Sequence, residues 1–292
     1  MQTPERRTHD PHVFGRVSRA LTPAVAFRVL KVCIDRPPPS IKAAPVIPAD
    51  GLLFDCDGVL VDSDEAATQA WNSWAAEYAP GFDFARDITH GRPAGDTVAE
   101  LVPARDLARA IQALMQLEIK TAPMVRAIPG AAELLPLLPR GSWTVVTSAV
   151  PAVARARLRA AGLPCPEGLV TVRDVRRGKP APDPYRIGAE RLGIAPARGV
   201  VFEDAEAGVT SALTAGIGWT VGVGERGLRT RAHLVVADLR DIRYNESVLD
   251  LRNAHILRHP DPAYRPDPAK PADPARSPHP ALLPDPEQLP VH

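Results

Sequence analysis

Short apolar runs, rich in valine, leucine and isoleucine, alternate with segments of helical periodicity through the middle of the chain. The runs are apolar at successive positions rather than at every second one, which is typical of strands covered on both faces. Such strands alternating with helices predict an α/β fold, in which a doubly wound parallel sheet has helices on both sides. The predicted strands are residues 51–55, 143–147, 168–172, 199–203, 219–223 and 234–237.

The connection between the first two runs is much too long for a simple crossover between parallel strands. It contains two helical repeats of apolar positions, one that includes Trp71 and Trp74 and one that includes Leu107 and Leu114. We therefore expect an α-helical cap domain inserted between these strands. The aromatic stripe of the first repeat is interpreted as helix packing within the cap.

Both ends of the chain differ from this pattern. The first segment is rich in arginine and lacks periodicity, and eleven of the 33 prolines follow Leu257. We expect both ends to be disordered because such segments bury little apolar surface. The predicted division is a disordered N-terminal extension at 1–48, a core domain at 49–64 and 130–245, a helical cap at 65–129, and a disordered proline-rich tail at 258–292.

Composition narrows the range of partners. The net charge is only +1, so no strong field draws the protein to nucleic acid or to a membrane surface. No apolar stretch reaches the ~20 residues that a membrane helix needs. Three cysteines without metal-ligand spacing fit a reducing cytoplasm better than a disulfide framework. We expect a cytoplasmic monomer whose partner is a small molecule.

Acidic residues follow the first predicted strand. Asp55 and Asp57 are two positions apart, and Gly58 comes next. Open α/β sheets bind ligands at the carboxyl ends of their strands, and two crowded carboxylates there favour Mg²⁺, which prefers oxygen ligands. The structural alternative is an acidic turn that simply closes the strand.

Three later segments also carry polar groups. Thr147 and Ser148 end the second strand, where hydroxyls and backbone N–H groups can hold a phosphate oxygen or merely cap a helix. Lys179 stands in a proline-rich loop, where it is either a fixed cation or a solvated surface residue. Glu203 and Asp204 follow the fourth strand, and adjacent acids there repel each other unless a cation is present.

In this order, the four motifs resemble those of the haloacid dehalogenase superfamily of phosphohydrolases. The resemblance covers roughly residues 50–240 and implies a Rossmann-like core. The inserted segment is similar to the helical cap shared by β-phosphoglucomutase and by sugar and polyol phosphatases. The matching motifs are Asp55-Cys56-Asp57-Gly58-Val59, Thr147-Ser148, Lys179-Pro180 and Glu203-Asp204.

The resemblance implies a role for each motif. Asp55 would be the nucleophile and Asp57 the general acid and base, while Thr147 and Lys179 would bind the transferring phosphoryl group. The implied reaction is Mg²⁺-dependent hydrolysis of a small phosphorylated metabolite, a sugar or polyol phosphate, through an aspartyl-phosphate. The implied metal ligands are Asp55, Asp57, Glu203 and Asp204.

Substrate choice is expected to come from the cap. The turn that contains His90 and Arg92 lies between its helical repeats and resembles that of sugar and polyol phosphatases, although such residues are often merely exposed. We expect these two residues and Ser148 to bind substrate. A β-phosphoglucomutase-like phosphomutase, which can use the same core, is the alternative enzyme.

Two further hypotheses come from other classes. Residues 222–227 match the G-x-G-x-x-G pattern of dinucleotide-binding oxidoreductases, but they follow the fifth strand, whereas that fold places the glycines after its first strand. They are also explained as a glycine-rich loop that closes the core. A non-catalytic binding module leaves the ordered acidic motifs unexplained.

Overall fold

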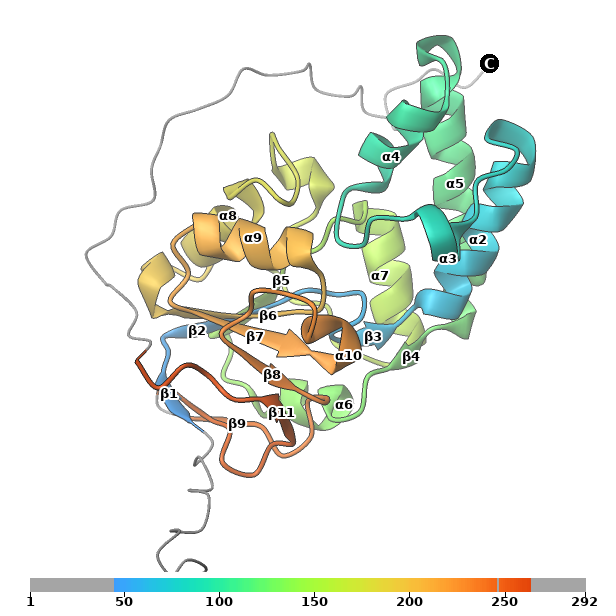
Figure 1. Ribbon diagram of the computed structural model, residues 1–292. Helices are drawn as coiled ribbons and strands as arrows, with labels where there is room; N and C mark the ends of the chain where they lie inside the picture. The colour runs from blue at the N-terminus through green and yellow to red at the C-terminus, as the bar shows by residue number, and fades with distance from the viewer. Residues whose placement is uncertain (1–44, 246, 264–292) are drawn as a thin grey trace, which may run out of the picture. The chain divides into compact units, whose positions relative to one another are not determined.

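A six-stranded sheet, in the order β11-β8-β7-β6-β2-β5, carries the fold (Figure 1). The computed structural model describes residues 45–245 and 247–263, which all belong to the same unit of the chain. The five strands from β8 to β5 are parallel, and β11 pairs antiparallel with β8 at one edge. In sheet order, the strands span Ile256–Arg258, Leu234–Val236, Trp219–Val223, Gly199–Glu203, Gly51–Phe54 and Trp143–Val145.

Successive residues of β2 pack on opposite faces of the sheet. Leu52 and Phe54 belong to one apolar cluster, which includes residues of helix α7, whereas Leu53 belongs to a second cluster with residues of α8 and α9. All residues of β2 are buried, which explains its continuous apolar sequence. The covering helices are α7 (Pro151–Ala160), α8 (Asp183–Arg191) and α9 (Glu206–Thr214).

The position of β2 within the sheet matters for function. It lies between β5 and β6, so the chain adds its next strand on one side of β2 and its later strands on the other. Such a reversal opens a crevice at the carboxyl ends of the strands, where ligands bind in open α/β sheets. The predicted doubly wound fold is therefore confirmed.

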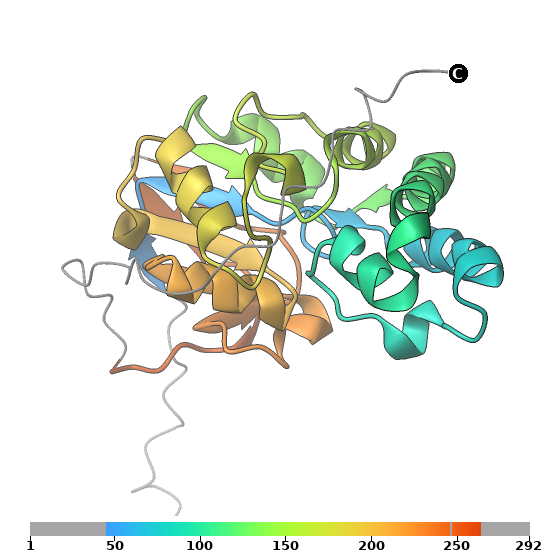
Figure 2. The same cartoon turned by 90° about the horizontal axis from the view of Figure 1, so that it is seen from above.

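The segment between β2 and β5 contains a group of helices. Their apolar cluster includes Trp71, Trp74, Phe84 and Leu114, and the Trp74 indole N–H donates to the Ala110 carbonyl at 2.9 Å. Both predicted helical repeats are present, as the long helices α2 and α5, which pack against each other. Figure 2 shows these helices, cyan to green, gathered beside the sheet. They comprise α2 (Asp64–Tyr78), α3 (Phe84–Asp87), α4 (Ala94–Leu101), η1 (Ala104–Asp106), α5 (Leu107–Thr121) and η2 (Ala122–Met124).

The two chain segments that join these helices to the core pair with each other. Strand β3 (Val61–Asp62) leaves the core and is antiparallel to β4 (Arg126–Ala127), which returns to it. The start and end of the inserted segment therefore lie side by side. The described core also contains the short helices α6 (Ala131–Leu134), η3 (Leu135–Leu137), η4 (Val172–Asp174), η5 (Pro196–Arg198) and α10 (Gly224–Gly227).

The strand predicted at 168–172 is wrong. Only an isolated bridge joins Val170 to Val146, and Thr171 instead caps the helix η4. The Asp174 carboxylate accepts hydrogen bonds from the Thr171 backbone N–H at 2.8 Å and hydroxyl at 2.7 Å. Because this capping box satisfies the Thr171 N–H locally, the strand does not continue.

The predicted ends also need correction. The extension predicted at 1–48 overlaps β1 (Val46–Pro48), and the tail predicted from 258 overlaps the last residue of β11. A three-stranded antiparallel sheet, β1-β10-β9, joins the first end to β9 (Arg243–Asn245) and β10 (Val248–Asp250). These short strands are ordered because their apolar residues are buried: Ile47 and Leu249 both belong to the main core cluster. Residues 1–44 and 264–292 lie outside the described residues.

Within the described ranges, no helix combines the length and apolarity that crossing a bilayer requires.

Candidate active site

A buried acid begins the site directly after β2. The Asp55 backbone N–H continues the sheet ladder to the Phe202 carbonyl at 2.9 Å, which fixes Asp55 at the carboxyl edge of the sheet. Its side chain is almost fully buried. Burial raises the pKa of Asp55 well above its usual range, and the neighbouring acids Glu203 and Asp204 add to the rise, although Lys179 opposes it. The carboxylate therefore lies where positive charge stabilises it.

Lys179 reaches this acid from the proline-rich loop. Its Nζ donates to Asp55 Oδ1 at 2.7 Å, to Glu203 Oε1 at 2.7 Å and to the Val146 carbonyl at 3.0 Å, and it lies 5.0 Å from the centre of the Tyr185 ring. Burial by itself lowers the pKa of Lys179, but Asp55 and Glu203 together raise it above its usual value. Lys179 is therefore a buried, fixed cation and not a solvated surface residue.

Glu203 is completely buried and has all of its contacts inside the protein. Its Oε1 also accepts the Tyr185 hydroxyl at 2.8 Å, and its Oε2 accepts the backbone N–H groups of Asp204 at 3.0 Å and Ala205 at 3.1 Å. These contacts hold the carboxylate in place beside Lys179. Glu203 thus orients the lysine and adds negative charge next to it.

Asp204 comes directly after β6 and is buried, with 4% of its surface exposed. Burial raises its pKa to about 7, with Glu203 as the next cause, while Arg226 opposes the rise. Arg226 Nε donates to Asp204 Oδ2 at 2.7 Å, and its Nη1 pairs with Asp64 at the start of α2. Oxygen atoms of Asp55, Glu203 and Asp204 all lie within 4.8 Å of one another.

Gly58, at the end of the acidic turn, has a backbone conformation and a close neighbour that only glycine accommodates. Its φ of +80° lies in the left-handed region, and a Cβ atom there would stand 2.1 Å from Asp204 Oδ2. Any side chain would clash with this carboxylate, so glycine allows the segment after Asp57 to approach Asp204.

Asp57 faces the cavity with both of its carboxylate oxygens engaged. Oδ1 accepts the Ser63 hydroxyl at 2.6 Å, and Oδ2 accepts Arg157 Nη1 at 2.9 Å. The second guanidinium nitrogen of Arg157 donates to Glu118 Oε1 at 2.9 Å. Sequence reasoning identified Asp57 but missed Arg157, Glu118 and Arg226.

The hydroxyl residues after β5 lie beside this acid cluster. Thr147 is buried, and its Oγ1 accepts the Ala149 backbone N–H at 3.1 Å. Ser148 donates its hydroxyl to the Gly91 carbonyl at 2.7 Å, so it contacts the turn of the inserted segment.

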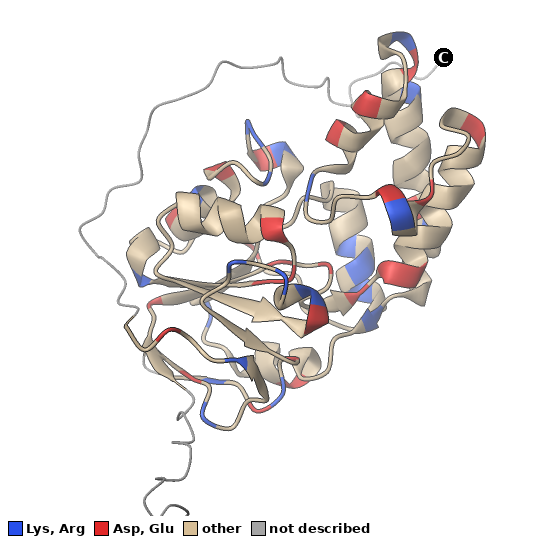
Figure 3. Cartoon of the chain, viewed as in Figure 1, with Lys and Arg blue, Asp and Glu red and all other residues tan. Residues whose placement is uncertain are grey.

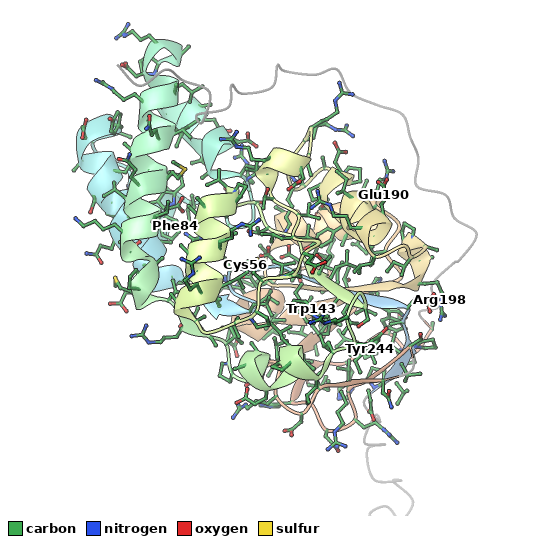
Figure 4. The ribbon with its side chains drawn as sticks, turned by 180° about the vertical axis from the view of Figure 1, so that it is seen from behind. Cys56, Phe84, Trp143, Glu190, Arg198 and Tyr244 are labelled. Atoms are coloured by element: carbon green, nitrogen blue, oxygen red, sulfur yellow. The ribbon has the colours of Figure 1, made fainter. Side chains whose placement is uncertain are left out.

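That turn carries the two predicted cap residues. His90 stands edge-on to Phe84 with ring centres 5.8 Å apart, and burial lowers its pKa. Arg92 forms an ion pair with Glu100 at 2.6 Å and keeps 28% of its side chain exposed. Figure 4 labels Phe84 among the cap helices and Cys56 between those helices and the sheet.

One cavity of about 700 Å³ joins these groups. Its walls combine the sheet edge with apolar residues of the cap, including Trp71 and Leu114, whereas Lys179 and Glu203 lie behind the wall. The predicted site residues that line it are Asp55, Asp57, His90, Arg92, Thr147, Ser148 and Asp204.

The glycine-rich segment 222–227 has a structural role. Gly224–Gly227 forms only the short helix α10, and Gly222 packs closely against Gly227. A dinucleotide fold needs a long helix after this pattern, so the geometry does not support an oxidoreductase. The segment instead delivers Arg226 to Asp204.

Residues 49–216, more than half of the chain, match the haloacid dehalogenase-like hydrolase family. The chain belongs to this family. It is 42% identical to hexitol phosphatase A of Escherichia coli over 171 residues, which cover 57% of this chain and 79% of that protein. It is also 30% identical to glycerol-1-phosphate phosphohydrolase 2 of Saccharomyces cerevisiae over 177 residues, which cover 56% of this chain and 70% of that protein.

A solved structure supports the fold. The crystal structure of a hydrolase from Pseudomonas syringae matches with a TM-score of 0.58 and 25% identity, covering 65% of this chain and 94% of that chain. The predicted family and the predicted class, a phosphoric monoester hydrolase, are therefore confirmed.

Proposed function

We propose that this hydrolase releases phosphate from a sugar or polyol phosphate through a phosphorylated Asp55. The observation that carries the proposal is the buried Asp55 carboxylate, held by Lys179 and clustered with Asp204 at the edge of a cavity. The substrate class is supported by the relatives, one a hexitol phosphatase and one a glycerol-1-phosphate phosphohydrolase. A cavity of about 700 Å³ suits a metabolite of that size.

The acid cluster fits Mg²⁺. The oxygens of Asp55, Glu203 and Asp204 converge within 4.8 Å, and burial together with the neighbouring carboxylates raises the pKa of Asp55 and of Asp204. We propose that Asp55, Asp204 and the Asp57 carbonyl hold the ion, while the engaged carboxylate of Glu203 contributes charge. Mg²⁺ bound there would offset negative charge on the phosphoryl oxygens.

The proposed reaction has two steps. In the first, an Asp55 oxygen attacks phosphorus, the bond between phosphorus and the sugar oxygen breaks, and Asp57 in its acid form protonates that oxygen to give the alcohol. In the second, a water oxygen attacks phosphorus and gives its proton to the Asp57 carboxylate. The bond between phosphorus and Asp55 then breaks, which releases inorganic phosphate.

Two residues are assigned to the phosphoryl group. Lys179 already touches the attacking carboxylate, so its charge lies next to the oxygens that must be neutralised. Thr147 lies buried at the end of the neighbouring strand and lines the same cavity. The rest of the substrate is assigned to His90, Arg92 and Ser148, which all line the cavity. His90 and Arg92 belong to the cap turn, and Ser148 donates a hydrogen bond to Gly91 of that turn.

The test is phosphate release from a panel that includes hexitol, glycerol and fructose phosphates, with Mg²⁺ and with EDTA. We expect EDTA to abolish turnover until Mg²⁺ is restored, and Asp55→Asn to fold normally without activity. Asp62→Asn, which changes an exposed acid in β3, is the matched control and should keep activity.

Retained turnover by Asp55→Asn would refute the covalent step. Isomerisation of glucose 1-phosphate without phosphate release would identify a phosphomutase instead.

A further inference from the structure

Arg157 is a buried cation that the proposed reaction has not yet used. Its side chain is only 7% exposed, and among the described residues its guanidinium touches two acids, Asp57 and Glu118. Figure 3 shows several basic positions along α7, and its arginines are Arg155, Arg157 and Arg159. Of these, only Arg157 faces inward, because Arg155 and Arg159 are exposed.

Burying an arginine is unfavourable unless its charge is compensated. The face of α7 that carries Arg157 is otherwise apolar, with Val153, Ala154 and Leu158 all fully buried. An aliphatic residue would suit this environment better. The contacts of Arg157 therefore point to a function rather than to packing.

The contacts of Arg157 join three parts of the molecule. Asp57 follows β2 in the core, α7 belongs to the core, and Glu118 comes from α5 in the cap. Helices α5 and α7 pack against each other, and Glu118 is itself buried between them. The guanidinium therefore ties the orientation of Asp57 to the docking of α5.

We propose that Arg157 is a positioning residue for the acid and base Asp57, and that Glu118 holds Arg157 in place from the cap. This inference rests on the proposed function. Ser63 and Arg157 each occupy one lone pair of a different carboxylate oxygen, which fixes the carboxylate plane. Asp57 lines the cavity, where the leaving oxygen and the attacking water have to come.

The test uses two substrates that differ in their need for an acid. A sugar or polyol phosphate expels an alkoxide and needs the Asp57 proton, whereas 4-nitrophenyl phosphate expels a stable phenolate and does not. For Arg157→Ala we expect kcat on the polyol phosphate to fall about 100-fold, with KM changed by less than about threefold.

The aryl substrate gives a second signature. Transfer to Asp55 should remain fast, but water attack needs Asp57 as a base. We therefore expect Arg157→Ala to show a burst of about one nitrophenolate per enzyme, with phospho-Asp55 accumulating in acid-quenched samples. Asp57→Asn should show the same burst.

Two conservative variants separate positioning from folding. Arg157→Lys keeps the charge but cannot contact both acids as a fork, so we expect a loss of about tenfold with the same burst. Glu118→Gln keeps the volume and should show a partial loss of the same kind. Arg155→Ala, on the exposed face of the same helix, is the control and should match the wild type.

The outcomes are distinguishable. If wild-type protein forms no phosphoenzyme and releases no phosphate, the proposed function is refuted. If the wild type is active but Arg157→Ala and Arg157→Lys lose both substrates equally and without a burst, or lose neither, the positioning role is overturned. If Arg157→Ala does not fold, Arg157→Lys and Glu118→Gln decide by the same criteria.

Discussion

Replacing Lys179 by methionine tests the electrostatic basis of the site. The lysine is 1% exposed and forms the only ion pairs that the described residues offer to Asp55 and Glu203. Methionine has a similar length and keeps the apolar contacts of the stem. The substitution therefore removes the charge while leaving the packing largely intact.

The expected loss of stability follows from the two carboxylates that stay buried when the lysine charge is removed. Breaking a buried ion pair by removing one partner costs about 3–5 kcal/mol, because the other charge stays buried without compensation. Lys179 compensates two acids, so we expect the upper half of this range. For a domain of this size, such a loss lowers Tm by about 10 °C or more.

The assay is thermal and urea unfolding in the absence of metal, at neutral pH. Two further variants serve as a compensation test and as a control. Glu203→Gln in the Lys179→Met background removes one of the two uncompensated acids, so it should restore part of the lost stability. Arg198→Met breaks an exposed ion pair with Asp50 and should change the free energy of unfolding by less than about 1 kcal/mol.

Two results would contradict this reasoning. If Lys179→Met unfolds at the same temperature and urea concentration as Arg198→Met, the acids of the cluster do not depend on the lysine charge. Strictly additive losses in the double variant would show that Lys179 and Glu203 do not interact energetically.

The remaining predictions concern pH and substrate choice. Burial lowers the pKa of His233 to about 4, so protonation favours the unfolded chain, and stability falls as pH drops from the usual value near 6.5 towards 4. His233→Asn should remove roughly 2 kcal/mol of the difference between urea unfolding at pH 7 and at pH 4.5, after allowing for the partial exposure of the ring; an unchanged difference would contradict the assignment. For Arg92→Ala we expect KM for the polyol phosphate to rise about tenfold with aryl-phosphate hydrolysis kept, because Arg92 borders the cap side of the cavity. Equal losses on both substrates would remove Arg92 from substrate selection, and Glu100→Gln controls for its ion pair.

The fold was predictable where residues were buried on both faces. Strands such as β2 and β6 are buried at every position, and their continuous apolar runs are distinctive. Strands β1 and β9 have three residues each, with only the middle one buried, which is too short a pattern to identify. The run at 168–172 was apolar enough for a strand, but the capping of η4 prevailed.

The acidic part of the candidate site was predictable because the carboxyl ends of parallel strands meet at one edge. The arginines were not, since their partners are distant in sequence: Arg157 contacts Asp57, 100 positions away, and Arg226 contacts Asp64, 162 positions away. A signal for Arg157 did exist. It stands on the buried stripe of α7, just as Glu118 stands on the stripe of α5 with Ala110 and Leu114, and a charged residue on an apolar stripe indicates a buried partner.

The charges around the cavity share one arrangement. Three basic side chains each bridge two carboxylates, so six acids surround three cations. Two of these bridges join the core to the cap, because Glu118 lies on α5 and Asp64 begins α2. The bridges orient the acids but leave negative charge in excess, which agrees with the raised pKa values of Asp55 and Asp204. The Mg²⁺ ion proposed for the sheet edge would offset this excess charge, so the same residues would both favour the ion and hold the cap against Asp57, the proposed acid and base. The bridging pairs are Asp55 and Glu203 for Lys179, Asp57 and Glu118 for Arg157, and Asp64 and Asp204 for Arg226.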